Sequence, residues 1–202
     1  MKRPMQLATA LCLLLVSACG MLPDKTPESL SWEEHLQRMQ ALSHWSAAGK
    51  LALRTRDQSE SGTMLWQQVG NSTHLRLSGP MGLSATTIES DGEVIHVRQG
   101  KESKSWNLKD QTSLMEQTGM DLPLNALPYW LKGIPAPQLK VQSMELDHDT
   151  ELLSRLQQQG WQVEYESYEL FDELMLPTRV RIQRNQSKVL LVVRQWQDIS
   201  DQ

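Results

Sequence analysis

Apolar and polar positions alternate over most of the chain, which is the pattern of half-buried β-strands. In the first such run, from Trp45 to Leu53, every odd-numbered residue is small or apolar. The same kind of pattern predicts five more strands before residue 110, over residues 62–69, 73–79, 84–90, 93–99 and 102–107. Asp91-Gly92 separates two of these runs and is typical of a tight hairpin.

Strand patterns return after residue 137. Residues 138–146 and 161–168 favour strands, and Val180 and Ile182 lie between polar neighbours. The unbroken apolar run 189–193 predicts a strand that is covered on both faces. Residues 151–158 fit a helix or a strand equally well on their pattern alone.

Helical spacing occurs in two places. Ser31 and Glu34 form a capping-box signature, and the apolar residues that follow at intervals of three and four predict an amphipathic helix near 31–43. Similar spacing predicts two short helices within 110–133. Short strands about ten residues apart, interrupted by a helical insert, indicate a mainly β fold with helices (α+β), an antiparallel barrel or sandwich formed by one domain over 31–202.

Residues 1–18 have the order of a secretory signal. Lys2 and Arg3 precede an apolar run over 7–16, which is shorter than the roughly 20 residues that a membrane span requires. Val16-Ser17-Ala18-Cys19 resembles the lipobox of bacterial lipoproteins. We therefore expect residues 1–18 to be a lipoprotein signal peptide.

Cys19 would then be the first residue of the mature chain, with an S-diacylglycerol and an N-acyl group as its covalent modification. Residues 19–30 are polar and contain Pro23 and Pro27, so they predict a lipidated tether. Gly20 follows the cysteine where an aspartate would resemble an inner-membrane retention signal. We expect a lipid-anchored protein on the periplasmic face of the outer membrane.

The composition of the chain narrows the range of functions that we expect. Without residues 1–18 the chain keeps 24 acidic residues against 18 basic ones, which argues against a nucleic-acid partner. We find no catalytic or metal-binding signature, and Asp147-His148-Asp149 is best interpreted as a solvated loop. The expectation is a protein that is not an enzyme and has no cofactor or metal. Its seven tryptophans, against one phenylalanine, suit either a core or a groove.

Several segments share a family pattern when they are taken in order. They are Trp66-Gln67-Gln68, Leu75-Arg76-Leu77-Ser78-Gly79-Pro80-Met81-Gly82, Gly119-Met120-x-Leu122-Pro123-Leu124-Asn125-x-Leu127-x-x-Trp130-Leu131-x-Gly133-x-Pro135, Trp161-x-Val163-x-Tyr165-x-x-Tyr168, Leu176-Pro177 and Trp196. Together, behind a lipobox, they resemble the LolB family of outer-membrane lipoprotein receptors over about residues 31–197.

The resemblance implies a half-open antiparallel β-barrel with helices that cover a concave apolar cavity. It also favours a strand for 151–158, paired with 161–168. It implies a monomer that accepts lipoproteins from a LolA-like periplasmic carrier by binding their acyl chains and inserts them into the lipid of the outer membrane. For the cavity wall, our candidates are Trp66, Leu127, Trp130 and Leu131, although each of them could simply fill a core.

Pro80, Met81, Gly82 and Leu83 form the predicted membrane-insertion loop. Proline and glycine at these positions suit a type I turn with Met81 at its tip. The family has a leucine where this chain has Met81, and methionine is similar in size and apolarity. The competing interpretation is an outer-membrane lipoprotein scaffold or assembly factor without an acyl-chain cavity.

Overall fold

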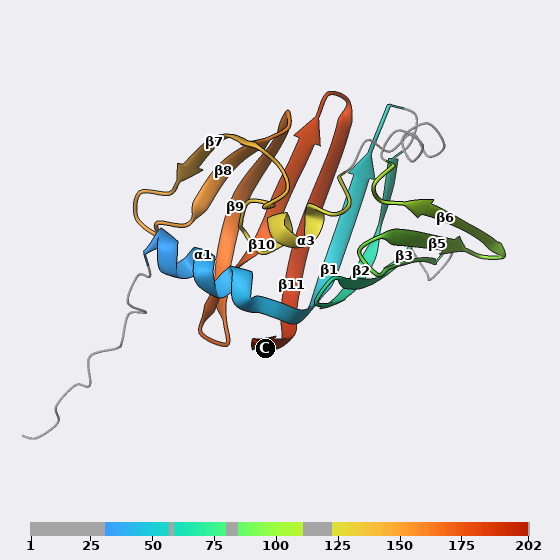
Figure 1. The fold of residues 1–202 in the computed structure, drawn as a ribbon, viewed down its shortest axis with the longest axis horizontal. Helices are drawn as coiled ribbons and strands as arrows, with labels where there is room; N and C mark the ends of the chain where they lie inside the picture. The colour runs from blue at the N-terminus through green and yellow to red at the C-terminus, as the bar shows by residue number, and fades with distance from the viewer. Residues whose placement is uncertain (1–30, 57–58, 80–84, 111–122, 202) are drawn as a thin grey trace, which may run out of the picture.

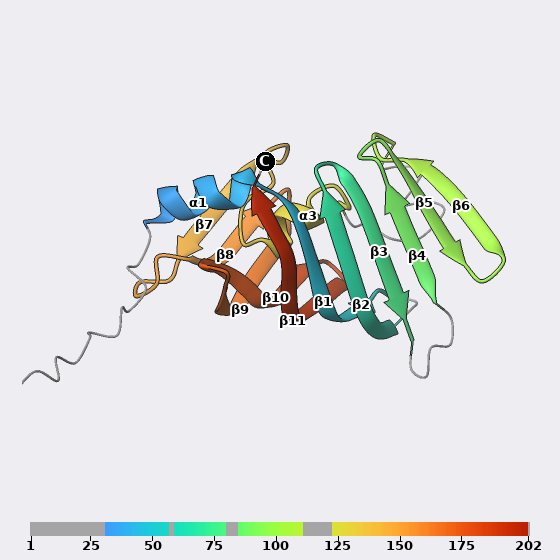
Figure 2. The same ribbon diagram turned by 90° about the horizontal axis from the view of Figure 1, so that it is seen from below.

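The computed structural model describes residues 31–56, 59–79, 85–110 and 123–201, and gives only the backbone of 198–201. Its strands form one eleven-stranded antiparallel sheet in the order β6-β5-β4-β3-β2-β1-β11-β10-β9-β8-β7. The order does not close on itself, because β6 and β7 are its two edges. The sheet curls, and the two helices of the described residues lie on the same face (Figures 1 and 2). The prediction of a mainly antiparallel β fold is confirmed.

Six strands precede the helical insert and five follow it. The first six are β1 (Leu42–Arg54), β2 (Ser59–Val69), β3 (Ser72–Ser78), β4 (Thr86–Ser90), β5 (Val94–Gln99) and β6 (Glu102–Asn107). The last five are β7 (Val141–Leu146), β8 (Leu153–Gln158), β9 (Trp161–Phe171), β10 (Leu174–Arg184) and β11 (Ser187–Asp201). Every predicted strand therefore exists, with shifted ends.

The N-terminal helix α1 (Trp32–Ala41) begins where the capping box predicts. The Ser31 amide donates to Glu34 Oε2 at 3.1 Å, and the Glu34 amide donates to Ser31 Oγ at 3.4 Å. These two bonds satisfy amides that a helix start leaves without partners. The helix ends two residues before the predicted end, because β1 starts at once with the buried Leu42.

Tight turns join neighbouring strands as their sequences predict. Asp91 Oδ1 accepts from the amides of Glu93 and Val94, both at 2.8 Å, and so closes the β4–β5 hairpin. Gln159 and Gly160 have φ angles of 47° and 78° and turn β8 into β9. Residues 153–158 are thus a strand, as the family resemblance implied.

Strand β1 is the centre of the sheet, where it pairs with β2 on one side and with β11 on the other. A bulge lies between Ala48 and Gly49 in the pairing with β11. A Cβ atom at Gly49 would stand 2.0 Å from the carbonyl oxygen of Val192, so only glycine allows this close approach. This seam joins the two halves of the sheet.

One expectation needs correction, and a second is tested only in part. The run 189–193 is not covered on both faces: Leu190 and Val192 are half-exposed and alternate with the buried Val189, Leu191 and Val193. Lys50, Arg179 and Arg181 flank them on the outer face, where aliphatic stems of long cationic side chains can cover part of the apolar surface. Of the two predicted short helices, the described residues contain α3 (Leu127–Leu131), and 111–122 lie outside the description.

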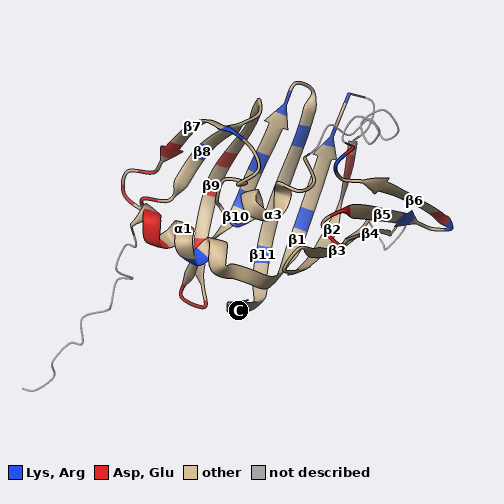
Figure 3. Cartoon of the chain, viewed as in Figure 1, with Lys and Arg blue, Asp and Glu red and all other residues tan. Residues whose placement is uncertain are grey.

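Charged side chains are spread over the sheet rather than gathered in one basic region. Lys and Arg lie along β1, β10 and β11, while acidic residues lie at the start of α1 and on β7 (Figure 3). Arg179 and Arg181 both pair with Glu166 on the outer face. Because these pairs are partly exposed, we assign them a small contribution to stability.

Candidate functional site

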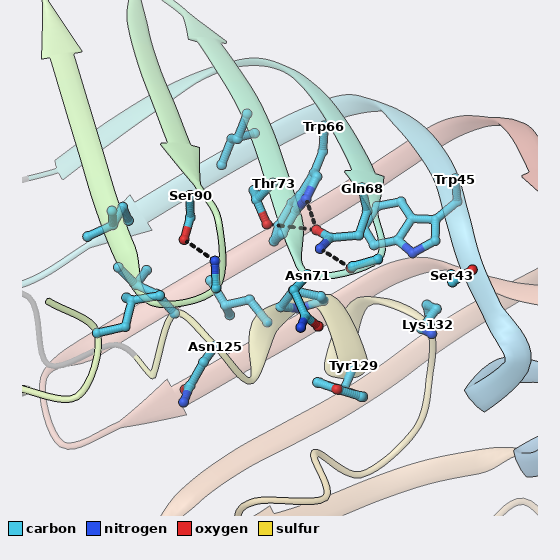
Figure 4. Close-up of a pocket in the computed structure, with 18 of the residues that line it drawn as sticks. Ser43, Trp45, Trp66, Gln68, Asn71, Thr73, Ser90, Asn125, Tyr129 and Lys132 are labelled. Atoms are coloured by element: carbon cyan, nitrogen blue, oxygen red, sulfur yellow. Dashed lines mark hydrogen bonds between the residues drawn. The ribbon is translucent and has the colours of Figure 1, made fainter.

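A cavity of about 410 Å³ lies on the concave face, between the sheet and the segment that contains α3 (Figure 4). The volume is within the range of roughly 300–1,000 Å³ that small-molecule sites occupy. Strands β1 to β5 form one wall and residues 124–132 form the other. The lining residues are Gln40, Leu42, Ser43, Trp45, Trp66, Gln68, Gly70, Asn71, Thr73, Leu75, Ile88, Ser90, Gly92, Ile95, Leu108, Leu124, Asn125, Leu127, Pro128, Tyr129, Lys132 and Gln138.

The cavity has two chemically different ends. Toward β4 and β5 the lining contains the aliphatic side chains Ile88, Ile95, Leu108 and Leu124, together with the polar residues Ser90 and Asn125. Ile88 and Leu124 pack against both apolar clusters of the described structure, so this end lies where the two clusters meet. Toward the start of β1 the lining is polar and includes the side chains of Ser43, Tyr129 and Lys132, all labelled in Figure 4.

The indole of Trp66 is held in place by a polar network at the bottom of the cavity. Trp66 Nε1 donates to Gln68 Oε1 at 3.1 Å, and Thr73 Oγ1 donates to the same oxygen at 2.7 Å. Gln68 Nε2 donates to the Gly70 carbonyl at 2.8 Å. Gln68 is itself buried, so these bonds satisfy an amide that would otherwise be costly to bury. The network fixes Trp66 relative to the β2–β3 turn.

Gln158 on β8 fixes the opposite wall. It is fully buried and accepts from Trp130 Nε1 at 2.7 Å and from the Ala136 amide at 2.9 Å. Its own NH₂ group donates to the carbonyls of Ala136 and Leu139, each at 2.9 Å. One side chain thus ties the segment 130–139 to the sheet. Gly133 completes the docking, because its φ is 80° and a Cβ there would stand 2.9 Å from the Tyr168 hydroxyl.

The four cavity candidates from the sequence occupy two different places. Trp66 and Leu127 line the cavity. Trp130 and Leu131 are fully buried in the main core, where Trp130 packs against Trp161 with ring centroids 6.2 Å apart. All seven tryptophans of the chain are buried, and two of them, Trp45 and Trp66, also line the cavity. The tryptophans therefore serve both the core and the groove.

Sequence reasoning missed the polar residues that organise the site. Lys132 occupies an unassigned position between Leu131 and Gly133 of the family pattern, and no local signal marks it as buried. Gln68 and Gln158 also look like ordinary polar residues of strands in the sequence, with no motif that marks their side chains as buried. Gln68 follows the alternation of β2, so parity alone places it on the same face as Trp66. Gln68 also stands in the family segment Trp66-Gln67-Gln68, which gave it no role.

Cys19 and the loop residues Pro80, Met81, Gly82 and Leu83 lie outside the described residues.

Within the described segments, no cluster of three histidine, cysteine or acidic side chains could hold a metal ion. Asp147 accepts from the amides of Asp149 and Thr150 and so shapes the turn after β7. In those same segments, neither helix has the length and apolarity needed to cross a bilayer.

Two solved structures share the fold with very low sequence identity. A DUF1329 family protein from Desulfovibrio piger has a TM-score of 0.53 and 9% identity, over 83% of this chain and 91% of that one. A domain from Vibrio parahaemolyticus that is assigned to outer membrane lipoprotein sorting has a TM-score of 0.50 and 9% identity, with the same coverage. At such identities these likenesses show the fold alone.

Sequence relatives are much closer. A protein named outer-membrane lipoprotein LolB from Stutzerimonas stutzeri is 31% identical over 95% of this chain and 94% of its own length. The protein of that name from Alkalilimnicola ehrlichii is 32% identical over 97% and 98%. The one from Pseudomonas savastanoi pv. phaseolicola is 36% identical over 82% and 80%. The family described as outer membrane lipoprotein LolB matches residues 43–196. The chain belongs to the LolB family.

Proposed function

We propose that this chain is an outer-membrane lipoprotein receptor that accepts lipoproteins from a LolA-like carrier and inserts them into the membrane. The name of the relatives supports the cellular role. The observation that carries the proposal is the cavity of about 410 Å³ with an aliphatic end on the concave face of an open sheet. Such a cavity can cover acyl chains that would otherwise meet water.

The energy of acyl exposure explains why a receptor is required. Each methylene exposed to water costs about 0.8 kcal/mol, so chains of roughly 15 methylenes cost on the order of tens of kcal/mol per lipoprotein. Free diffusion through an aqueous compartment is therefore too unfavourable. A sequence of protein cavities can carry the chains, provided that each transfer is downhill in free energy. No step in this transfer requires the protein to be an enzyme or to hold a cofactor.

Within the cavity, Trp66 and Leu127 are our candidates for direct acyl contact. Trp130 and Leu131 would act from beneath, because they hold α3 in place while they remain covered by the core. In this arrangement the segment around α3 is the cover of a half-open barrel. Photo-crosslinkers at 66 and 127 should capture bound lipoprotein, whereas crosslinkers at 130 and 131 should react within the chain. Capture from all four positions with equal yield would contradict this division.

We further propose that residues 1–18 are removed as a signal peptide and that Cys19 is acylated. Residues 19–30 would then tether the single domain 31–202, as a monomer, to the periplasmic face of the outer membrane. Cys19→Ala should release the domain into the soluble fraction or leave it unprocessed, while its fold is retained. Metabolic labelling with a tagged fatty acid measures this directly. A Cys19→Ala protein that still incorporates the label would contradict the assignment.

The loop Pro80 to Leu83 connects the paired strands β3 and β4, and we assign it to membrane insertion. An apolar tip such as Met81 can enter a bilayer and give the acyl chains a path out of the cavity. Met81→Glu should leave acceptance from the carrier intact but slow delivery to liposomes at least about tenfold, since burying a carboxylate in lipid is costly. Met81→Leu is the matched control. Normal delivery by Met81→Glu would show that the tip is only a turn.

The competing scaffold interpretation predicts a different result for the domain itself. A scaffold with a filled core should not bind an acyl probe at any concentration that leaves it folded. A receptor should bind the neutral reporter phenylnaphthylamine with a rise in fluorescence, and lipoprotein from the carrier should displace it. Depletion in the native host extends the test, because loss of a receptor leaves lipoproteins stranded in the periplasm.

A further inference from the structure

The polar end of the cavity contains a buried cation. Lys132 follows α3 and its side chain is 5% exposed. Its Nζ atom donates to the carbonyl oxygens of Met39 at 2.5 Å and of Leu42 at 2.7 Å. These carbonyls end α1 and begin β1, so the ammonium also faces the negative end of the helix dipole. An ammonium has three N–H groups, which leaves one donor beyond these two bonds.

Among the described residues, this charge has only neutral groups as partners. Lys132 takes part in none of the ion pairs formed by the described residues. The ring of Tyr129 lies 5.7 Å from Nζ and offers a weak cation–π contact. Burial lowers the pKa of the Lys132 ammonium from 10.5 to about 8, so it remains mostly protonated at neutral pH. A buried charge of this kind is strongly stabilised by an oxygen-bearing ligand.

The length of the cavity suits a single extended acyl chain. It runs from Lys132 and Ser43, beside the start of β1, to Ile95 on β5. Strands β1 and β5 are four spacings apart in the sheet order, which is roughly 19 Å along the sheet. One leaflet's share of a hydrocarbon core about 30 Å thick is about 15 Å, the reach of one chain. A chain can therefore lie in the cavity with its two ends in different chemical surroundings.

We propose that Lys132 binds the carbonyl or carboxylate oxygens at the head of a bound acyl chain, and that the methyl end points toward Ile95. This inference rests on the proposed function and adds an orientation to it. Ser43, which lines the same end, supplies a further polar group near the lipid head (Figure 4). The aliphatic residues Ile88, Ile95 and Leu124 enclose the tail. Lys132 thus selects lipids whose chain ends in oxygen over plain hydrocarbon.

The oxygen could come from the acyl groups of a lipoprotein or from a free fatty acid. Both present oxygen acceptors to the remaining N–H of Lys132, but only a free carboxylate also brings a negative charge. Hydrogen bonds to a charged group contribute about 1.5–3 kcal/mol, which corresponds to roughly a ten- to hundredfold change in affinity. The loss of affinity on replacing Lys132, measured for a fatty acid and for an ester of the same chain length, therefore distinguishes the two sources.

The test measures displacement of phenylnaphthylamine from the full-length domain by palmitic acid, monopalmitoyl glycerol and hexadecane, which have matched chain lengths. Lys132→Met, an unbranched apolar replacement, should weaken palmitic acid about ten- to a hundredfold and leave hexadecane within about twofold. Lys132→Arg should recover most of the preference. Lys140→Met, which changes an exposed lysine, is the matched control and should behave as the unchanged protein does.

The outcomes separate two failures. If the unchanged protein binds none of the three lipids, the proposed function fails and this inference falls with it. If it binds them but Lys132→Met keeps the full preference for palmitic acid over hexadecane, the inference alone is overturned. If Lys132→Met loses affinity for both palmitic acid and monopalmitoyl glycerol, the result supports a lipoprotein head group as the ligand. If it loses affinity for palmitic acid alone, the result supports a free fatty acid. Near-UV circular dichroism monitors folding, and Lys132→Gln replaces Lys132→Met if the latter does not fold.

Discussion

Two regions of the molecule have similar alternating strand sequences but pack very differently. We call α1, β1, β2, residues 123–139 and β8–β11 the body, and residues 72–108, which contain β3–β6, the wing. The body buries a continuous apolar core that includes six tightly packed strands and the segment around α3. In the described part of the wing, Leu75, Ile95 and Trp106 are the fully buried apolar residues, and all five residues of β4 are half-exposed.

The difference arises from what covers the concave face. Over the body, α1 and the segment held by Gln158 fill the space above the strands. The cavity begins over β1 and β2 of the body and extends over the wing, where Ile88 and Ile95 line it. A half-buried aliphatic side chain such as Ile88 gains further burial when an apolar ligand enters the cavity. The body therefore supplies stability, and the wing supplies unfilled apolar surface.

Among single substitutions, we expect replacement of Gln158 to lower the free energy of unfolding most. Gln158→Leu would remove the partner of three groups inside the body, which are Trp130 Nε1, the Ala136 amide and the Leu139 carbonyl. Each buried group left unsatisfied costs about 1–3 kcal/mol, so the free energy of unfolding should fall by at least about 3 kcal/mol. Urea unfolding monitored by tryptophan fluorescence measures it. Gln162→Leu, on the exposed face of β9, should change stability little.

The same deletion made in each region tests the comparison directly. Ile182→Ala removes a fully buried side chain of the body and should cost about 2–5 kcal/mol of unfolding free energy. Ile88→Ala acts on a half-exposed residue beside the cavity and should cost about 1 kcal/mol or less. It should weaken phenylnaphthylamine binding severalfold, however, while folded Ile182→Ala binds normally. Equal losses of stability would show that the wing is packed as tightly as the body.

Mild acid should destabilise the body through His35. This histidine is buried on α1 beside Trp32, and burial, helped by Arg38, lowers its pKa from 6.5 to about 4. The neutral form is favoured in the fold, so stability is complete above pH 6.5 and is lost as the pH falls toward 4. At pH 5 the loss should be about 2 kcal/mol.

His35→Phe should remove most of this pH dependence, as urea midpoints between pH 4 and 7 would show. The wing offers a matched control in His96, which is exposed. His96→Phe should leave the pH profile unchanged. A profile that flattens with His96→Phe and not with His35→Phe would place the acid-sensitive group in the wing.

Local features of the fold followed from the sequence because their causes are local. The capping box at Ser31, the Asp91-Gly92 hairpin and the alternation along β2 depend on residues within a few positions of one another. The family resemblance then favoured a strand for 151–158, of which 153–158 form β8, and directed attention to Trp66 and Leu127. Four candidates were named for the cavity wall, and these two of the four line it.

The rest depended on contacts between distant residues. Lys132 meets Met39 and Leu42 about ninety positions away, and Gln158 meets the segment after α3 only once the sheet has formed. Nothing in the local pattern separates Leu190, which is half-exposed, from Leu191, which is buried. The apolar run suggested cover on both faces, whereas the outer face is crossed by Arg and Lys side chains instead of a layer of helices.

The seam at Gly49 also has a consequence for folding kinetics. Every other strand pairing in the described sheet joins neighbours in sequence, and β1 with β11 is the one exception. Two meanders, β1–β6 and β7–β11, can each assemble from local hairpins, but the seam must close a loop of more than a hundred residues. Such closure is slow, because its entropy is lost before the contacts form. Gly49→Ala, which obstructs the seam, should therefore slow refolding more than an equally destabilising change inside either meander.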